Sequence, residues 1–88
     1  FDGTVMKYEV DLFYDKDSKE SCVIDFIETN DLSLANVVYE YLTHRFDDAV
    51  KILNNCNVHL RLNAIDTSDD DHCTVLKELN HIVWGNKS

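Results

Sequence analysis

The stretch that decides the fold is residues 5–14, which read VMKYEVDLFY. Apolar side chains occupy every second position, at Met6, Tyr8, Val10, Leu12 and Tyr14. Between them come the charged residues Lys7, Glu9 and Asp11. A period of two is typical of a β-strand with one buried and one solvated face, because successive side chains on a strand point to opposite sides. The sequence therefore predicts a strand that lies on a hydrophobic core.

Downstream of this stretch, a second strand and a helix are predicted. A polar turn over residues 15–20 leads to residues 21–28, which are rich in β-branched and aromatic side chains, so the two strands should form a hairpin. Capping side chains follow at Asn30, Asp31 and Ser33. The helix that they introduce shows the i, i+3, i+4, i+7 spacing of one helix face, at Leu34, Val37, Val38, Tyr41 and Leu42. We expect it to end near Arg45.

The second half of the chain predicts two more strands and another helix. Residues 49–53 form a short apolar run, and residues 58–64 alternate between apolar and polar side chains. An acidic loop over residues 66–71 precedes a second helical pattern, which consists of Val75, Leu76, Leu79, Ile82 and Val83 and closes at Gly85. The predicted fold class is therefore α+β with the order ββαββα, a four-stranded antiparallel sheet with two helices on one face.

Length and composition bound the domain organisation and the partners. The 88 residues suffice for a single domain over 1–88, and residues 1–5 are interpreted either as non-native or flexible, or as part of a longer polypeptide. Seventeen acidic against eight scattered basic residues give a net charge of -9, which argues against direct contact with nucleic acid. Three widely spaced cysteines indicate reduced thiols, and no apolar run is long enough for a membrane span, so the predicted location is intracellular, in the cytoplasm or nucleus.

Two residue sets are candidates for chemical sites. The acidic loop starting at Asp66 lacks the glycine and the glutamate of an EF-hand, because Asp71 and Lys77 occupy those positions. A zinc site or a cysteine–histidine catalytic pair could be assembled from Cys56, His59, His72 and Cys73, but the adjacency of the last two and the outward alternation of His59 argue against it. The sequence therefore predicts no catalytic residue, no metal and no cofactor.

Residues 27–36, which read IETNDLSLAN, resemble the hallmark of the small assembly subunit of archaeal and eukaryotic RNA polymerases. That subunit is called L in archaea and is related to the dimerisation domain of bacterial alpha. Asp31, Ser33, Leu34 and Asn36 match the motif in its strand-to-helix context, whereas Leu32 and Ala35 replace the histidine and the glycine of the family. The Pro-His-Pro turn of the family is also absent.

The resemblance implies a non-catalytic subunit that heterodimerises with a larger alpha-like partner in transcription. Capping residues and apolar helix faces would then make the interface, with Trp84 as a candidate hot spot. The partner-binding residues expected on this basis are Asp31, Ser33, Leu34, Asn36, Val37, Val38, Tyr41, Leu76, Leu79, Val83 and Trp84.

Two other classes of function stay open. An acidic protein of this size could mimic DNA and inhibit a nucleic-acid enzyme, in which case its carboxylates should form a row on one exposed surface. A small enzyme would require a pocket that gathers Cys56, His59 and a carboxylate. Homo- and hetero-oligomeric states are not distinguished by the sequence.

Overall fold

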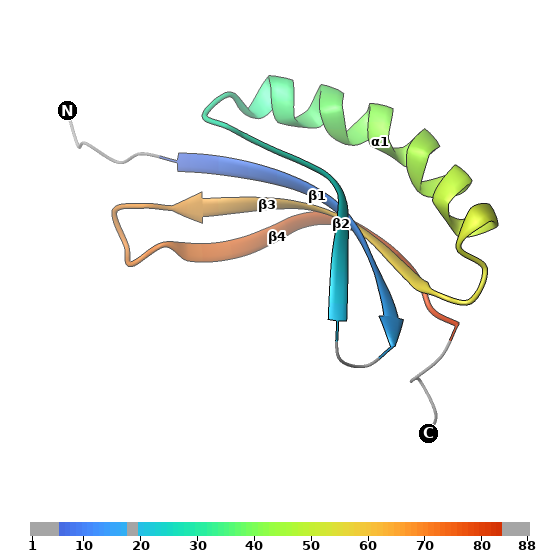
Figure 1. Cartoon of the computed structure of the whole chain (residues 1–88). Coiled ribbons are helices and arrows are strands. Elements are labelled where there is room, and N and C mark those ends of the chain that lie inside the picture. Colours follow the sequence, from blue (N-terminus) through green and yellow to red (C-terminus); the bar gives the residue numbers. More distant parts are fainter. Residues whose placement is uncertain (1–5, 18–19, 84–88) are drawn as a thin grey trace.

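The described part of the chain folds into one antiparallel sheet with one helix packed on it (Figure 1). The computed structural model describes residues 6–17 and 20–83. Its elements, in chain order, are β1 (Met6–Asp17), β2 (Glu20–Thr29), α1 (Leu32–Ile52), β3 (Asn57–Asp66) and β4 (His72–His81). The predicted α+β class and the four-stranded antiparallel sheet are thereby confirmed. The prediction of a second helix is wrong, because β4 occupies that part of the chain, and the observed order is ββαββ.

The strand order in the sheet is β2-β1-β3-β4, with every neighbouring pair antiparallel. β3 pairs with β1 along the whole length of β3, from Met6 opposite Asp66 to Asp15 opposite Asn57. The two hairpins therefore meet at the centre of the sheet, and β2 and β4 form its edges. Figure 1 shows α1 above the sheet, with the end of β1 and the start of β2 directed away from the helix.

The core lies between α1 and the two central strands. The alternation of residues 6–14 places Val10 and Leu12 on the buried face of β1, at 0% exposure. Val58, Leu60 and Leu62 of β3 are equally buried. Ala35, Tyr39, Leu42, Phe46 and Ala49 cover them from the helix. The sheet face toward α1 thus carries the hydrophobic stabilisation of the fold.

Helix α1 begins at a side-chain cap. Asp31 has extended backbone angles, and its carboxylate accepts hydrogen bonds from the backbone N–H of Ser33 at 2.9 Å and of Leu34 at 3.3 Å. Of the three predicted capping residues, Asp31 is therefore the one that satisfies the free amides of the first turn. Asn30 instead donates from Nδ2 to the carbonyl of Met6 at 3.0 Å and joins the helix entry to β1.

The helix extends through residues 49–52, where the sequence analysis predicted a third strand. The apolar stripe explains the difference, because Phe46 and Ala49 follow Leu42 at helical spacing and are buried with it. No glycine or proline occurs between residues 32 and 53 to end the helix earlier. The short apolar run at 49–53 is therefore the end of one long amphipathic helix.

Residues 72–81 form β4 and not the predicted second helix. Leu62 pairs with Lys77 and Asn63 pairs with Val75, so Leu76 is the extra residue of a β-bulge. A bulge interrupts the period of two. The apolar residues Val75, Leu76 and Leu79 consequently acquire a spacing that resembles a helix face. Trp84 and Gly85 lie outside the described residues.

The acidic loop is the turn that connects β3 to β4. Asp66 accepts hydrogen bonds from the backbone N–H and from Oγ of Ser68, at 3.0 and 2.7 Å. Asp70 and Asp71 adopt φ angles of 53° and 56°, a left-handed conformation that aspartate tolerates better than most residues. The loop chemistry thus favours a hairpin rather than the entry to a helix.

Candidate protein-binding surfaces

Strand β4 is uncovered on both of its faces. All residues from His72 to Asn80 are exposed, because α1 packs over β3, β1 and β2. The helix reaches β4 where Nζ of Lys77 lies 5.5 Å from the ring centre of Tyr39. Large apolar side chains on and just after this strand are between 38% and 47% exposed; they are Val75, Leu76, Leu79, Ile82 and Val83. We call this set the β4 surface.

A second apolar surface lies on the opposite flank of α1. Arg45 pairs through Nε with Oδ2 of Asp25 on β2 at 2.7 Å, which fixes the flank of the helix that faces β2. Helical spacing places Leu34, Tyr41 and Ile52 on this same flank, and they are 48%, 61% and 78% exposed. A cavity of about 340 Å³ opens beside Ile52; its lining is Ile24, Arg45, Asp48, Ala49, Ile52 and Leu53. We call this region the α1–β2 flank.

The predicted interface is therefore divided between two places. Leu76, Leu79 and Val83 belong to the β4 surface, whereas Leu34 and Tyr41 lie across α1 from them. Val37 is 64% exposed on the outer side of the helix, and Val38 packs partly against the core. Among the polar members, Asp31 is the N-cap, Asn36 donates from Nδ2 to the carbonyl of Leu32 at 3.2 Å, and Ser33 is exposed in the first turn. Trp84 lies outside the described residues.

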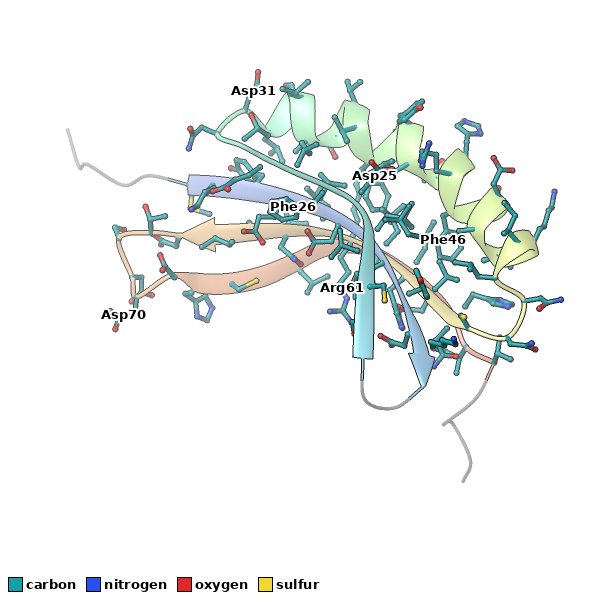
Figure 2. All side chains as sticks on the ribbon, in the orientation of Figure 1. Asp25, Phe26, Asp31, Phe46, Arg61 and Asp70 are labelled. Carbon is teal, nitrogen blue, oxygen red and sulfur yellow. The ribbon has the colours of Figure 1, made fainter. Side chains whose placement is uncertain are left out.

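The sheet face turned away from α1 is largely polar, and we call it the open face. It carries Glu9, Asp11 and Phe13 from β1, which alternate with the buried Val10 and Leu12. Across the strands, Glu9 lies opposite Glu28 and Asn63, and Asp11 lies opposite Phe26 and Arg61. Figure 2 shows Arg61 on the side of the sheet away from α1, and Phe46 between α1 and the sheet.

His59 connects three strands on the open face. Its Nε2 donates to Oδ2 of Asp15 on β1 at 3.0 Å, and its Nδ1 lies 2.7 Å from Oδ1 of Asn80 on β4. The ring stacks on Phe13 with their centres 4.9 Å apart. His59 is only 8% exposed, so these contacts satisfy a polar group that would otherwise be buried without partners. The sequence analysis placed His59 on the strand face that points away from the core, where it lies, but did not predict its burial. Its partners lie 44 and 21 positions away and follow no local pattern.

Three polar atoms near this network are buried and lack a hydrogen-bond partner among the described residues. They are Oδ1 of Asp11, Oδ1 of Asn63 and Nε of Arg61. Nε of Arg61 is 3.5 Å from Oε1 of Glu78, a charge contact too long to supply a good hydrogen bond. Burial raises the pKa of Asp11, and Arg61 partly offsets this. Burial also raises the pKa of Glu9, with smaller contributions from Asp11 and Glu28.

The raised pKa of Asp11 predicts a pH-dependent gain in stability for Asp11→Asn. A carboxyl whose pKa lies above its ordinary value of 3.8 in the folded chain stabilises the fold only while it is protonated. That contribution is present at low pH and is lost as the pH rises through the folded-state pKa. Urea unfolding should therefore show Asn at position 11 to be more stable than Asp at pH 7, with the difference shrinking toward pH 3. A difference that stays constant, or that grows at low pH, would contradict this cause.

The residues considered for metal or thiol chemistry do not come together. Cys56 directly precedes β3 and His59 lies near the start of that strand, whereas His72, which pairs with Asp66, and Cys73 lie at the far end of the sheet. Within residues 6–17 and 20–83, no three His, Cys, Asp or Glu side chains are placed to hold one metal ion. Over the same ranges, no helix combines the length and apolar character needed to cross a bilayer.

Comparison with protein-family models, with curated proteins and with solved structures gives no match for this chain. The surfaces described above are therefore the basis on which a function can be argued.

Proposed function

We propose that this chain is a protein-interaction module that binds its partner through the β4 surface. The observation that supports the proposal is a ten-residue edge strand with neither face covered and with Val75, Leu76 and Leu79 in contact with solvent. Small soluble domains usually protect long edge strands, because the unpaired backbone groups attract other chains. An edge that combines free backbone groups with aliphatic side chains suits the binding of another polypeptide.

Strand addition is the binding mode that this geometry favours. A partner strand alongside β4 would hydrogen-bond to its outward N–H and C=O groups, and its side chains would meet Leu79 on the helix side, where Leu79 lies opposite Leu60. The opposite edge, β2, is less suited because α1 already packs against it through Ile24 and Ile27. The two edges therefore differ in how much apolar area remains for a partner to bury.

The resemblance of residues 27–36 supports an alpha-like polymerase subunit as a candidate partner, with the chain serving as a non-catalytic assembly subunit. The interface would differ from the one that the resemblance implies, because residues 75–81 belong to strand β4 and not to a second helix. The alternative of a DNA mimic is less favoured. On the open face, Lys7 pairs with Glu28 at 2.7 Å and Arg61 lies near Glu78, so cations interrupt the row of carboxylates that a mimic requires.

The test is to compare Leu79→Asp with the matched variant Val37→Asp, each purified from the native source with whatever remains bound. A charge introduced at an apolar interface should weaken binding by about 2 kcal/mol or more, or about thirtyfold. We expect the partner to be lost from Leu79→Asp and retained by Val37→Asp. In the complex with wild type, hydrogen exchange should slow at alternate amides of residues 73–81.

The opposite result, in which Val37→Asp loses the partner and Leu79→Asp retains it, would place the interface on α1. Circular dichroism of both variants must show the wild-type spectrum before binding is compared. An untagged wild-type chain that remains monomeric and free of any partner at the concentration found in its source would refute the proposal as a whole.

A further inference from the structure

We propose that the open face around Glu9 binds an arginine side chain of a protein partner. This site has different residues from the β4 surface, because they come from β2, β1 and β3; Val75 of the β4 surface lies next to it, opposite Asn63. It would give the module a second contact with its partner. The open face would recognise a charged side chain, whereas the β4 surface would recognise apolar side chains and backbone groups.

Three acidic residues occupy neighbouring positions of the open face here. Glu9 and Glu28 lie opposite each other across β1 and β2, and Asp11 is the next residue of β1 on the same face. Directly opposed like charges are destabilising in a sheet. Lys7 neutralises Glu28, with its Nζ 2.7 Å from Oε2, but Glu9 has no ion pair among the described residues. An incoming cation would remove the mutual repulsion of Glu9 and Asp11.

Asn63 supplies an independent indication of a missing donor. It lies opposite Glu9 on β3, is only 8% exposed, and its Oδ1 has no hydrogen-bond partner within residues 6–17 and 20–83. Oδ1 of Asp11, the next residue after Glu9 on the same face of β1, is likewise buried without a hydrogen-bond partner among the described residues. A buried acceptor without a donor costs about 1–3 kcal/mol, which a ligand that supplies the donor recovers on binding. Both oxygens are shielded from water, so the donor must displace neighbouring side chains to reach them.

The surrounding rings favour a guanidinium over an ammonium. Phe26 lies opposite Asp11 and is 49% exposed, so a planar cation held by the carboxylates could stack on its ring. The chain already contains such an arrangement next to this site. The guanidinium carbon of Arg61 is 5.2 Å from the ring centre of Phe13, while its Nε faces Glu78. Arginine also offers five donors, enough to satisfy two orphaned oxygens and a carboxylate together.

The charge of the whole chain argues for a basic partner rather than a second copy. A net charge of -9 repels another molecule of the same chain and attracts a basic one. The occupant is therefore an arginine-bearing segment of a different protein.

The test is an NMR titration of the full chain with the blocked peptide Gly-Gly-Arg-Gly-Arg-Gly-Gly. We expect saturable amide shifts centred on Glu9, Phe26 and Asn63, weakening as salt is raised. The lysine analogue should bind about tenfold more weakly, as suits a site built for a planar, stacking cation. Glu9→Gln should reduce the affinity for the arginine peptide by about tenfold, whereas Glu40→Gln on the outer side of α1 should leave it unchanged.

Three results would overturn the proposal: shifts spread evenly over all acidic regions including residues 66–71, equal losses in Glu9→Gln and Glu40→Gln, or equal binding of the two peptides. Glu28→Gln provides a second variant should Glu9→Gln fail to fold. Leu79→Asp should bind the peptide like wild type, so the outcome here is independent of whether β4 is the main interface.

Discussion

Leu60→Ala is expected to lower the free energy of unfolding by about 2–5 kcal/mol, which for a domain of this size is a large part of the total. Leu60 sits at 0% exposure in the middle of β3, the strand that α1 covers and that joins the two hairpins. Truncation there leaves a cavity in the region where helix and sheet meet, and β1 and β3, each paired on both sides, resist collapse into it. Urea denaturation followed by circular dichroism measures the change.

The matched control for this prediction is Val37→Ala, at a side chain that is 64% exposed. Its effect should stay within about 0.5 kcal/mol, as for most surface substitutions. Equal destabilisation by the two variants would mean that α1 is not packed on the sheet through the face described here.

His59→Ala is expected to cost about 1.5–3 kcal/mol, the range for a buried hydrogen bond to a charged group. The substitution removes the contacts that link Asp15 on β1, His59 on β3 and Asn80 on β4, together with the stacking on Phe13. Thermal unfolding should therefore show a clear fall in the melting temperature.

Asn80→Ala serves as the comparison for His59→Ala, because it removes one of the two ring contacts and leaves the contact with Asp15 in place. We expect it to cost less than His59→Ala. If His59→Ala unfolds at the wild-type temperature, the three-strand connection contributes nothing to stability, and the buried ring must be satisfied by water instead.

Local patterns in the sequence predicted the parts of the fold that local physics determines. The alternation over residues 6–14 gave β1 and its buried face, and the capping group at Asp31 gave the start of α1. The errors arose where tertiary contacts override a short pattern. Residues 49–52 form a strand-like apolar run, but the stripe that begins at Ala35 keeps them in the helix.

The second error has a different cause, the bulge at Leu76. A strand with one extra residue no longer alternates, and the resulting spacing of Val75, Leu76 and Leu79 resembles that of a helix. Residues 72–81 form a strand because the edge of β3 is available to pair with them. No pattern within residues 72–81 indicates that this edge is available. Strand pairing also limits how much of the candidate sites the sequence predicts. Apolar residues at positions 76 and 79 were expected to bind a partner, whereas the juxtaposition of Glu9, Asp11 and Asn63 depends on the pairing of β1 with β3.

That pairing also has a consequence for how the chain reaches its native state. Both hairpins and α1 form from contacts between near neighbours in the sequence, but the seam at the centre of the sheet joins Val10 to Leu62. The intervening segment must be closed into a loop before the central strands can pair, and the entropy of that closure opposes the step. We therefore expect the two hairpins to form early and their joining beneath the helix to set the rate of folding.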